Sequence, residues 1–266
     1  MGRTGKHNRN NLRCLFFLVA TVLFSACSVK EDRILCPCIL EMEFAESDPA
    51  IVRSVELQVT SRNGFRYADT VSVAESGNRY SVPVPRTDLH IRAWAGTDGM
   101  ASEYGLLIPL GRACPEVYMH DSDVCAEGET VHDVIFMRKN YCAVTLITKG
   151  GVRLPSDVRV KGNVAGYDDK GQPVQGRFEV FLDDDSEAGV YEFVLPRQID
   201  SSLVMEVEDG QGGYKAFALG HYIASSGYDW NAADLEDVTV VIDYALTEIR
   251  LTISGWDGTY SYEMEI

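Results

Sequence analysis

Residues 54–73 read SVELQVTSRNGFRYADTVSV, and this stretch contains the pattern that decides the fold class. Val55, Leu57 and Val59 alternate with polar residues, as expected of a strand with one buried face. Asn63-Gly64 is a strong turn signal, and a second strand-like run follows at 65–73. The stretch therefore predicts a β-hairpin.

The same period of two recurs along the chain, and turn residues rich in Gly, Asn and Asp separate the runs. Residues 96–130 read instead as a long connection with only short strands. No window of helical length has a convincing apolar face, and one helical turn is expected at 231–237. The first series of strands is expected at 40–44, 55–60, 71–73, 80–84, 89–93, 106–110, 116–119 and 131–137. The second is expected at 141–148, 157–164, 177–182, 190–195, 203–208, 214–218, 238–244, 249–254 and 260–266.

Two series of short strands predict an all-β protein made of two tandem antiparallel β-sandwich domains. The polar break Arg138-Lys139-Asn140 separates the series, so the domains are expected at 39–139 and 140–266. Each would be long enough to bury a core of its own. The final run, 260–266, reads as the last strand of the second domain, with a short strand donated to a partner as the alternative.

The first 26 residues have the composition of a secretory signal peptide. Basic residues and no acids occupy 1–13, and the apolar run CLFFLVATVLF at 14–24 is too short for a transmembrane helix. Small residues then precede Cys27, and 23–27 resembles the lipobox of bacterial lipoproteins. Cys27 is the predicted lipidation site, through which acyl chains would hold the chain on a membrane.

Residues 27–38 are expected to form a lipidated tether. Within it Lys30, Glu31 and Asp32 stand close behind the lipidated cysteine. This basic-acidic triplet resembles the surface-export signal of certain Gram-negative lipoproteins, and so implies the outer membrane, with the chain facing the cell exterior.

The charge of the chain argues against some partners. Four of the 24 basic residues precede Cys27 and all 40 acidic residues follow it, so residues 27–266 have a formal charge of −20. Nucleic-acid binding needs a basic footprint, and an anionic membrane surface would repel this chain. We therefore expect no nucleic-acid partner, and membrane association only through the lipid on Cys27.

The remaining cysteines are candidates for disulfide bonds, since the signal peptide implies an oxidising compartment. Two of them, Cys36 and Cys38, are too close in sequence to pair comfortably with each other. Their number is odd, and sequence does not decide the connectivity. No zinc-ligand spacing is present, so no metal site is expected. The candidates are Cys36, Cys38, Cys114, Cys125 and Cys142.

Several other features admit a functional and a structural interpretation. The acidic stretches 168–169 and 183–185 could hold Ca²⁺, but lack the spacing of an EF-hand loop and read better as solvated turns. The aromatic residues in 222–230, with Trp94 and Trp256, could stack on sugars, but core packing explains them more simply. The histidines are scattered and no Gly-x-Ser-x-Gly motif is present, so no Ser-His-Asp triad can be inferred from the sequence.

Taken together, these features resemble the FimB-type fimbrial anchor lipoproteins. The resemblance rests on the lipoprotein start, on Cys36-Pro37-Cys38 followed at once by the strand at 39–44, and on the closing stretch LEDVTVVIDY at 235–244 with 249–254 and Gly255-Trp256. It covers nearly the whole chain after Cys27. It implies two transthyretin-like β-sandwiches and a lipid-anchored protein that tethers the base of a fimbria to the cell and limits fibre length. The implied partner is a fimbrial structural subunit, and the resemblance implies no enzymatic activity and no cofactor.

Two other functions remain open from the sequence. The first is a surface glycan-binding lipoprotein built from the same tandem sandwiches. The second, a secreted hydrolase, is the weakest, because no pair of catalytic carboxylates stands out, although such pairs come together only in the fold.

Overall fold

The computed structural model describes residues 36–45, 52–154, 158–182, 189–208, 212–243, 248–255 and 258–264, with the backbone alone from residue 243 onward. The chain divides into two units, Met1–Pro37 and Cys38–Ile266, and every element below lies in the second. No helix in the described part of the chain has the length and apolar composition needed to span a membrane. The predicted signal peptide and most of the predicted tether lie outside the described residues.

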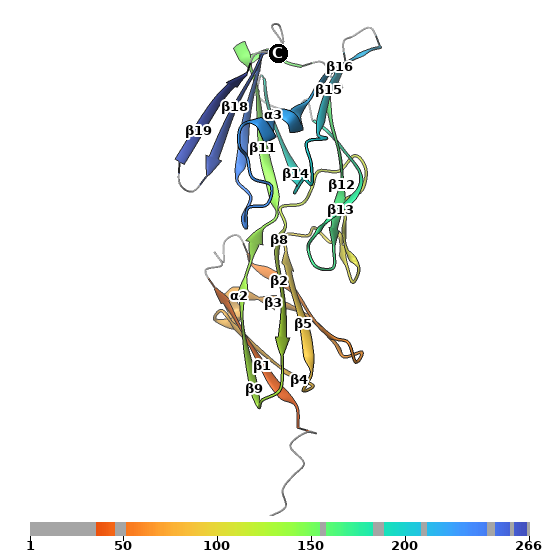
Figure 1. The fold of residues 1–266 in the computed structure, drawn as a ribbon, viewed down its shortest axis with the longest axis vertical. Helices are drawn as coiled ribbons and strands as arrows, with labels where there is room; N and C mark the ends of the chain where they lie inside the picture. Colours follow the sequence, from red (N-terminus) through yellow and green to blue (C-terminus); the bar gives the residue numbers. More distant parts are fainter. Residues whose placement is uncertain are drawn as a thin grey trace, which may run out of the picture. The chain divides into compact units, whose positions relative to one another are not determined.

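The protein is mostly β, with several antiparallel sheets (Figure 1). The first half contains β1 (Cys38–Ala45), β2 (Ser54–Ser61), β3 (Arg66–Ser72), α2 (Val73–Ser76), β4 (Arg79–Val84), β5 (Asp88–Ala95), β6 (Ala101–Ser102), β7 (Gly105–Leu107), β8 (Tyr118–Cys125) and β9 (Thr130–Phe136). The second contains β10 (Arg138–Lys139), β11 (Tyr141–Thr148), the 3₁₀ turn η2 (Lys149–Gly151), β12 (Val158–Asp168), β13 (Pro173–Phe181), β14 (Val190–Pro196), β15 (Val204–Glu208), β16 (Tyr214–Phe217), α3 (Leu219–Ser225), β17 (Asp237–Asp243), β18 (Glu248–Gly255) and β19 (Gly258–Met264).

The predicted hairpin is confirmed as β2 and β3. The two strands pair antiparallel from Ser54↔Ser72 to Thr60↔Arg66. The turn closes through the amide of Gly64, which donates to the Ser61 carbonyl at 3.1 Å, with Gly64 at φ 85°. Only glycine adopts this backbone without strain.

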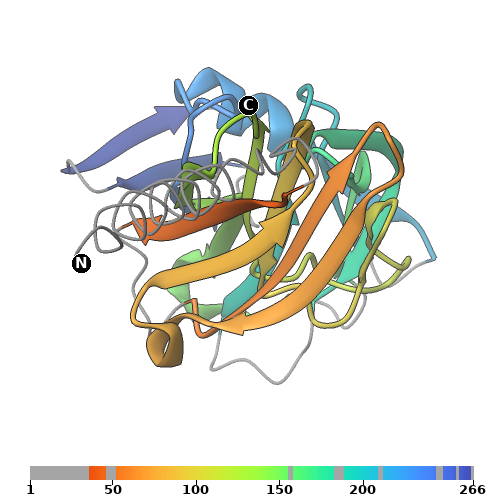
Figure 2. The ribbon, with the colours of Figure 1, turned by 90° about the horizontal axis from the view of Figure 1, so that it is seen from below.

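Two sheets enclose the first hydrophobic core. One has the order β4-β1-β9 and the other β10-β8-β5-β2-β3. Figure 2 shows β1 in one layer and β2 and β3 in the other. Alternate side chains of both layers point inward, and Leu40, Phe44, Leu57 and Ile91 are at most 2% exposed. The core forms because strands with a period of two place every second residue on one face.

The second half repeats these pairings around a second core. The first strand of each half, β1 or β11, pairs antiparallel with β4 or β14 and parallel with β9 or β17. Likewise β2 pairs with β3 and β5, as β12 pairs with β13 and β15. The second half then adds β18 and β19 to the edge of β17. The expectation of wholly antiparallel sheets is therefore wrong at two pairs, β1–β9 and β11–β17, whose partners are far enough apart in sequence for a parallel crossover.

Residues from the predicted first domain also pack into the second core. Strand β7 pairs with β12 from Gly105↔Asp168 to Leu107↔Gly166, and Leu106, Ile108 and Val117 join the second core. The contact is close: a Cβ on Gly166, at φ 145°, would lie 2.0 Å from the Leu106 carbonyl oxygen. Part of the chain before residue 139 thus packs into the second core.

Two further elements differ from the sequence-based expectation. Strand β8 runs for eight residues, YMHDSDVC, where only a short strand at 116–119 was expected. Helix α3 occupies Leu219–Ser225, and the turn expected at 231–237 is not a helix. A helix of seven residues is too short to show the i, i+3, i+4, i+7 repeat on which prediction depends. The final strand β19 pairs with β18 of its own sheet, as expected for the last strand of the second half.

Candidate functional site

The residues with the most specific predicted chemistry lie outside the described part of the chain. These are the lipidation residue Cys27 and the export triplet Lys30, Glu31 and Asp32. Their roles stay predictions.

The structure assigns the disulfide candidates to different environments. Cys38 is buried in the first core, Cys114 and Cys142 are buried in the second, and Cys125 is exposed at the end of β8. These four are free thiols in the structure, and disulfide pairing of the candidates stays a prediction. Separation into two cores explains why Cys38 does not reach Cys114 or Cys142. Any pairing that involves Cys36, which is exposed, stays a prediction.

The thiols differ in pKa for different reasons. Burial raises the pKa of Cys142 to about 12 and that of Cys114 still further. Cys125 is exposed, yet a hydrogen bond to the Asp88 carboxylate raises its pKa to about 11. A thiol reacts as its thiolate, so none of these three is an activated nucleophile at neutral pH.

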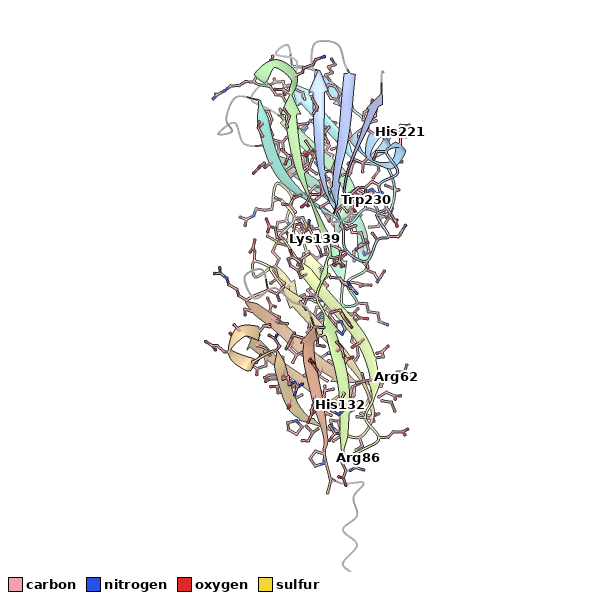
Figure 3. All side chains as sticks on the ribbon, turned by 90° about the vertical axis from the view of Figure 1, so that its left-hand side faces the viewer. Arg62, Arg86, His132, Lys139, His221 and Trp230 are labelled. Atoms are coloured by element: carbon pink, nitrogen blue, oxygen red, sulfur yellow. The ribbon has the colours of Figure 1, made fainter. Side chains whose placement is uncertain are left out.

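The aromatic residues of 222–230 belong mostly to the core. Tyr228 and Trp230 are each 8% exposed and pack edge to face, with ring centroids 4.6 Å apart. The Tyr228 hydroxyl donates to the Glu236 carbonyl at 2.7 Å. Core packing, and not a sugar-stacking surface, therefore explains these two residues, including Trp230, which is labelled in Figure 3.

The acidic turn at 168–169 is explained by local hydrogen bonds. Asp168 Oδ1 accepts from the amides of Lys170 at 2.9 Å and Gln172 at 2.8 Å, which closes the β12–β13 turn. Residues 183–185 lie outside the described residues. Among the described residues, no group of three His, Cys, Asp or Glu side chains is arranged to hold a metal ion.

One histidine stands near a serine and an aspartate, although the sequence did not suggest it. Ser122 Oγ donates to Asp133 Oδ2 at 2.6 Å and lies 3.1 Å from His120 Nε2. However, His120 Nδ1 accepts from the Phe136 amide at 3.2 Å, which assigns the ring proton to Nε2. The histidine therefore has no lone pair directed at the serine, and the group joins β8 to β9 without activating a nucleophile.

A cavity of about 700 Å³ lies beside the second core, and one of its lining residues, Tyr118, packs against both cores. We call it the junction pocket. It is lined by the segment after β5, the segment before β8, and single residues of β8, β11 and β14. These residues are Gly96, Asp98, Cys114, Pro115, Glu116, Tyr118, Tyr141 and Val194.

The close approach of two backbone segments shapes this pocket. Gly96 has φ 69°, and a Cβ at this position would lie 2.1 Å from the Glu116 carbonyl oxygen, so only glycine fits. Two residues later Asp98 also has positive φ, at 50°. The amide of Cys114 donates to the Val194 carbonyl at 3.2 Å, which fixes the other side of the pocket on the edge of β14.

Two tyrosines place their hydroxyls together in the junction pocket. The Tyr118 and Tyr141 rings are nearly perpendicular, with centroids 5.6 Å apart, and their hydroxyl oxygens lie 3.2 Å apart. The Tyr141 hydroxyl also donates to Glu116 Oε2 at 3.5 Å. Burial, followed by the hydrogen bond with Tyr118, raises the pKa of Tyr141, so its phenol stays protonated.

A lysine of the chain lies against one of these rings. Lys139, labelled in Figure 3, places its ammonium nitrogen 4.6 Å from the Tyr141 ring centroid and 2.5 Å from Asp237 Oδ1. Its neighbour Arg138 bonds Asp234 Oδ2 at 2.9 Å. The polar break expected between the two series is therefore held by ion pairs to residues shortly before and at the start of β17.

The sequence did not identify the junction pocket. Glu116 and Asp98 fall in the stretch 96–130, which reads as an irregular connection, and Tyr141 reads as the first residue of a strand. The one usable signal was Gly96 and Gly99 around an aspartate, which is typical of a turn rather than of a binding site.

No known protein-family profile matches this sequence, and no curated protein matches it. Solved structures do resemble it. A polysaccharide-binding candidate from Bacteroides thetaiotaomicron is 15% identical, covers 86% of this chain and 98% of its own, and gives a TM-score of 0.61. A candidate adhesin from Bacteroides ovatus is 14% identical, with 90% and 98% coverage and a TM-score of 0.59.

The third resembling structure is the fimbrial anchor protein Mfa2 from Porphyromonas gingivalis. It is 14% identical, covers 83% of this chain and 98% of its own, and gives a TM-score of 0.59. At these identities the likeness concerns the fold: this chain shares its fold with the fimbrial anchor Mfa2 and with the two Bacteroides proteins.

Proposed function

We propose that this protein is a lipid-anchored surface protein of the outer membrane that tethers the base of a fimbria to the cell and limits fibre length. Lipid on Cys27 would hold it on the membrane, and Lys30, Glu31 and Asp32 would direct it to the exterior. Its partner would be a fimbrial structural subunit, and it would have no catalytic role.

The observation that carries this proposal is the shared fold with a fimbrial anchor over 83% of the chain, behind a lipoprotein-like start. Either feature alone would be weak, because one fold hosts many functions. Their combination supports the anchor function, because this chain has both the fold of a fimbrial anchor and an N-terminal sequence suited to membrane attachment.

We also propose that the two cores are tandem transthyretin-like β-sandwiches. The support is the repeated strand pairing, in which each half places its first strand between an antiparallel and a parallel neighbour. Two sheets contribute to each core, which is the layering expected of a sandwich.

An anchor needs an edge that a fibre subunit can contact, and the sheets of this protein offer several. In the described part of the chain, β3, β4, β9, β14, β16 and β19 each form an edge of their sheet. Some backbone groups on these edges already have hydrogen-bond partners within the chain. The Phe136 amide of β9 donates to the His120 ring, and the Val194 carbonyl of β14 accepts from the Cys114 amide. Exposed strand edges are the usual sites for adding a partner strand.

The test is the fate of the fibre when lipidation is blocked in the bacterium that makes the protein. Cys27→Ala should release fimbriae into the medium, and the matched control Cys14→Ala, which alters a cysteine inside the predicted signal peptide, should retain them. Mass spectrometry of the N-terminal peptide should find acyl chains on Cys27 in the control strain only. Fimbriae that stay attached in the Cys27→Ala strain would contradict the proposal.

The second candidate is a surface glycan-binding protein, which the fold shared with a polysaccharide-binding candidate favours. Binding of labelled polysaccharides to the purified protein, with unchanged fimbriae in a deletion strain, would favour this candidate over the anchor.

A further inference from the structure

We propose that the turn between β2 and β3 is a site of covalent modification, at which Asn63 deamidates by an intramolecular reaction with the amide nitrogen of Gly64. The proposal rests on the sequence and geometry of this turn and does not depend on the anchor function. The turn follows directly after Arg62, which is labelled in Figure 3.

The first argument is the residue that follows the asparagine. Five asparagines lie after Cys27, and Asn63 is the one followed by glycine. Because Gly64 has no side chain, its amide nitrogen is open to reaction with the side-chain carbonyl of the residue before it. In the other four pairs a side chain on the second residue shields this nitrogen: Asn78-Arg79, Asn140-Tyr141, Asn163-Val164 and Asn231-Ala232.

The second argument is the open space around the turn. Asn63 and Gly64 are both exposed, and a Cβ added to Gly64 would meet no atom within 4 Å. Water therefore reaches both residues, and no neighbouring side chain blocks a change of conformation at Gly64. Asparagine is a thermolabile residue type, and exposed loop tips are among the parts of a fold that open most readily.

The reaction balances with water as the one added reactant. The Gly64 nitrogen loses its proton and forms a bond to Asn63 Cγ, and the side-chain nitrogen leaves with that proton as ammonia. The product is a succinimide ring. Water then opens the ring at either carbonyl, which gives aspartate or isoaspartate. The net change takes up one water, releases one ammonia and places a new carboxylate at residue 63.

The third argument concerns the hydrogen bonds that restrain the turn. The Gly64 amide donates to the Ser61 carbonyl at 3.1 Å, and Asn63 Nδ2 donates to Thr87 Oγ1 at 3.3 Å. Both the nitrogen that attacks and the amide that leaves are thus engaged in the closed turn. The reaction must therefore proceed from a transiently opened turn. Conversion should be slower in the folded protein than in the unfolded chain, and faster when the bond to Thr87 is removed.

The modification would also alter the turn itself. The new carboxylate adds a negative charge directly after Arg62. Isoaspartate in addition lengthens the main chain between Ser61 and Phe65, whose backbone hydrogen bond of 3.0 Å closes the hairpin. Hydrogen exchange in residues 61–65 should therefore be faster in the isoaspartate form than in the unmodified protein.

The test incubates the purified protein at mildly alkaline pH and follows residue 63 by mass spectrometry. Digestion with pepsin at acid pH limits further conversion during preparation, and electron-transfer fragmentation separates aspartate from isoaspartate. Asn78 is the internal control, because it is also exposed in a turn but precedes Arg79. The variants are Asn63→Gln, which removes the reacting residue, and Thr87→Val, which removes the hydrogen bond and keeps the branched shape. A sample unfolded in guanidinium chloride gives the unrestrained rate.

We expect Asn63 to convert at least tenfold faster than Asn78, with both products present, and no conversion at residue 63 in Asn63→Gln. Unfolding and Thr87→Val should each raise the rate several-fold. The proposal is overturned if Asn63 in the folded protein converts no faster than Asn78. It is also overturned if unfolding and Thr87→Val both leave the rate unchanged. None of these outcomes bears on fibre anchoring, which is tested separately.

Discussion

Arg197 donates from Nε to Oδ1 of Asn140 at 2.6 Å, and so joins the segment after β14 to the residue before β11. Asn140 is 9% exposed, and its side-chain amide also lies 3.1 Å from the sulfur of Met119 on β8. The Tyr167 hydroxyl donates to the Asn140 carbonyl and accepts from the Arg197 amide. The buried Asn140 therefore contacts β8 of the first half of the chain as well as β12 and the segment after β14 in the second half.

Replacing this asparagine should destabilise the protein measurably. Asn140→Ala leaves the half-buried Arg197 guanidinium without one of its acceptors, so we expect the free energy of unfolding to fall by about 1–3 kcal/mol. Urea denaturation, monitored by tryptophan fluorescence, would measure this free energy of unfolding. Asn63→Ala, which removes only the exposed hydrogen bond to Thr87, should change it by less than about 0.5 kcal/mol. Equal effects of the two variants would show that the Asn140 network contributes little.

The close contact between β7 and β12 predicts a second effect. Gly166→Ala would drive a Cβ into the Leu106 carbonyl, so we expect β7 to separate from β12 and stability to fall by more than about 2 kcal/mol. Hydrogen exchange should become faster in residues 101–107. Gly99→Ala is the control, because that glycine also has positive φ but a Cβ added to it would meet no atom within 4 Å. Unchanged exchange in 101–107 would argue against this pairing.

Stability should depend on pH through Asp133. Burial raises the pKa of this carboxyl, but hydrogen bonds from His120 and Ser122 outweigh burial and hold the pKa below its usual range. A lowered pKa in the folded state stabilises the protein above the unfolded pKa of about 3.9, and this contribution disappears as the pH falls through the folded value. Asp133→Asn should therefore be less stable than the unmodified protein at pH 7, with the difference shrinking below about pH 4. Urea midpoints from pH 7 to pH 3 would measure this, and a constant difference would contradict it.

The thiols should differ in reactivity towards a maleimide. Cys125 is exposed and should be modified in the folded protein, whereas the buried Cys38, Cys114 and Cys142 should react only after unfolding. Because Asp88 raises the pKa of Cys125 to about 11, Asp88→Asn should increase its modification rate several-fold at pH 8, and Glu75→Gln should not. If Cys125 reacts only after reduction, it is paired in a disulfide, and its assignment as a free thiol would be wrong.

The export triplet predicts a change of membrane leaflet. Replacing Lys30, Glu31 and Asp32 together by alanine should leave lipidation of Cys27 intact. The protein should then stay on the periplasmic side of the outer membrane instead of facing the cell exterior. Digestion of intact cells with proteinase K would then degrade the unmodified protein and spare the variant. Degradation of both would show that the triplet does not direct export.

The fold class was readable from the sequence because buried strand faces repeat every two residues. Val55, Leu57 and Val59 are each at most 2% exposed, as their alternation predicts. The full length of strand β8 was not predicted, because His120, Ser122 and Asp123 make it polar. Its place in the sheet comes from pairing with β5 rather than from a run of apolar residues. Tertiary context decides such strands, and local pattern does not.

The candidate sites were less predictable, for a physical reason. The predicted lipidation site is indicated by contiguous residues around Cys27, so the sequence contains the whole pattern on which that prediction depends. The junction pocket joins Asp98, Glu116 and Tyr141, which come from separate segments that meet only after the strands pair. The aromatic residues of 222–230 could not be assigned to core or surface by composition, because burial of Trp230 depends on packing against the second core.

The most direct test of the anchor proposal is to identify what the protein binds in its own membrane. The full-length protein would be isolated from gently solubilised outer membranes, with the Cys27→Ala strain as the control expected to lack the anchor, and the proteins that co-purify would be identified by mass spectrometry. We expect a fimbrial structural subunit to co-purify with the anchored protein and to appear with its variant in the medium. Recovery of glycan-import proteins instead, or of no fimbrial subunit in either fraction, would contradict the proposal.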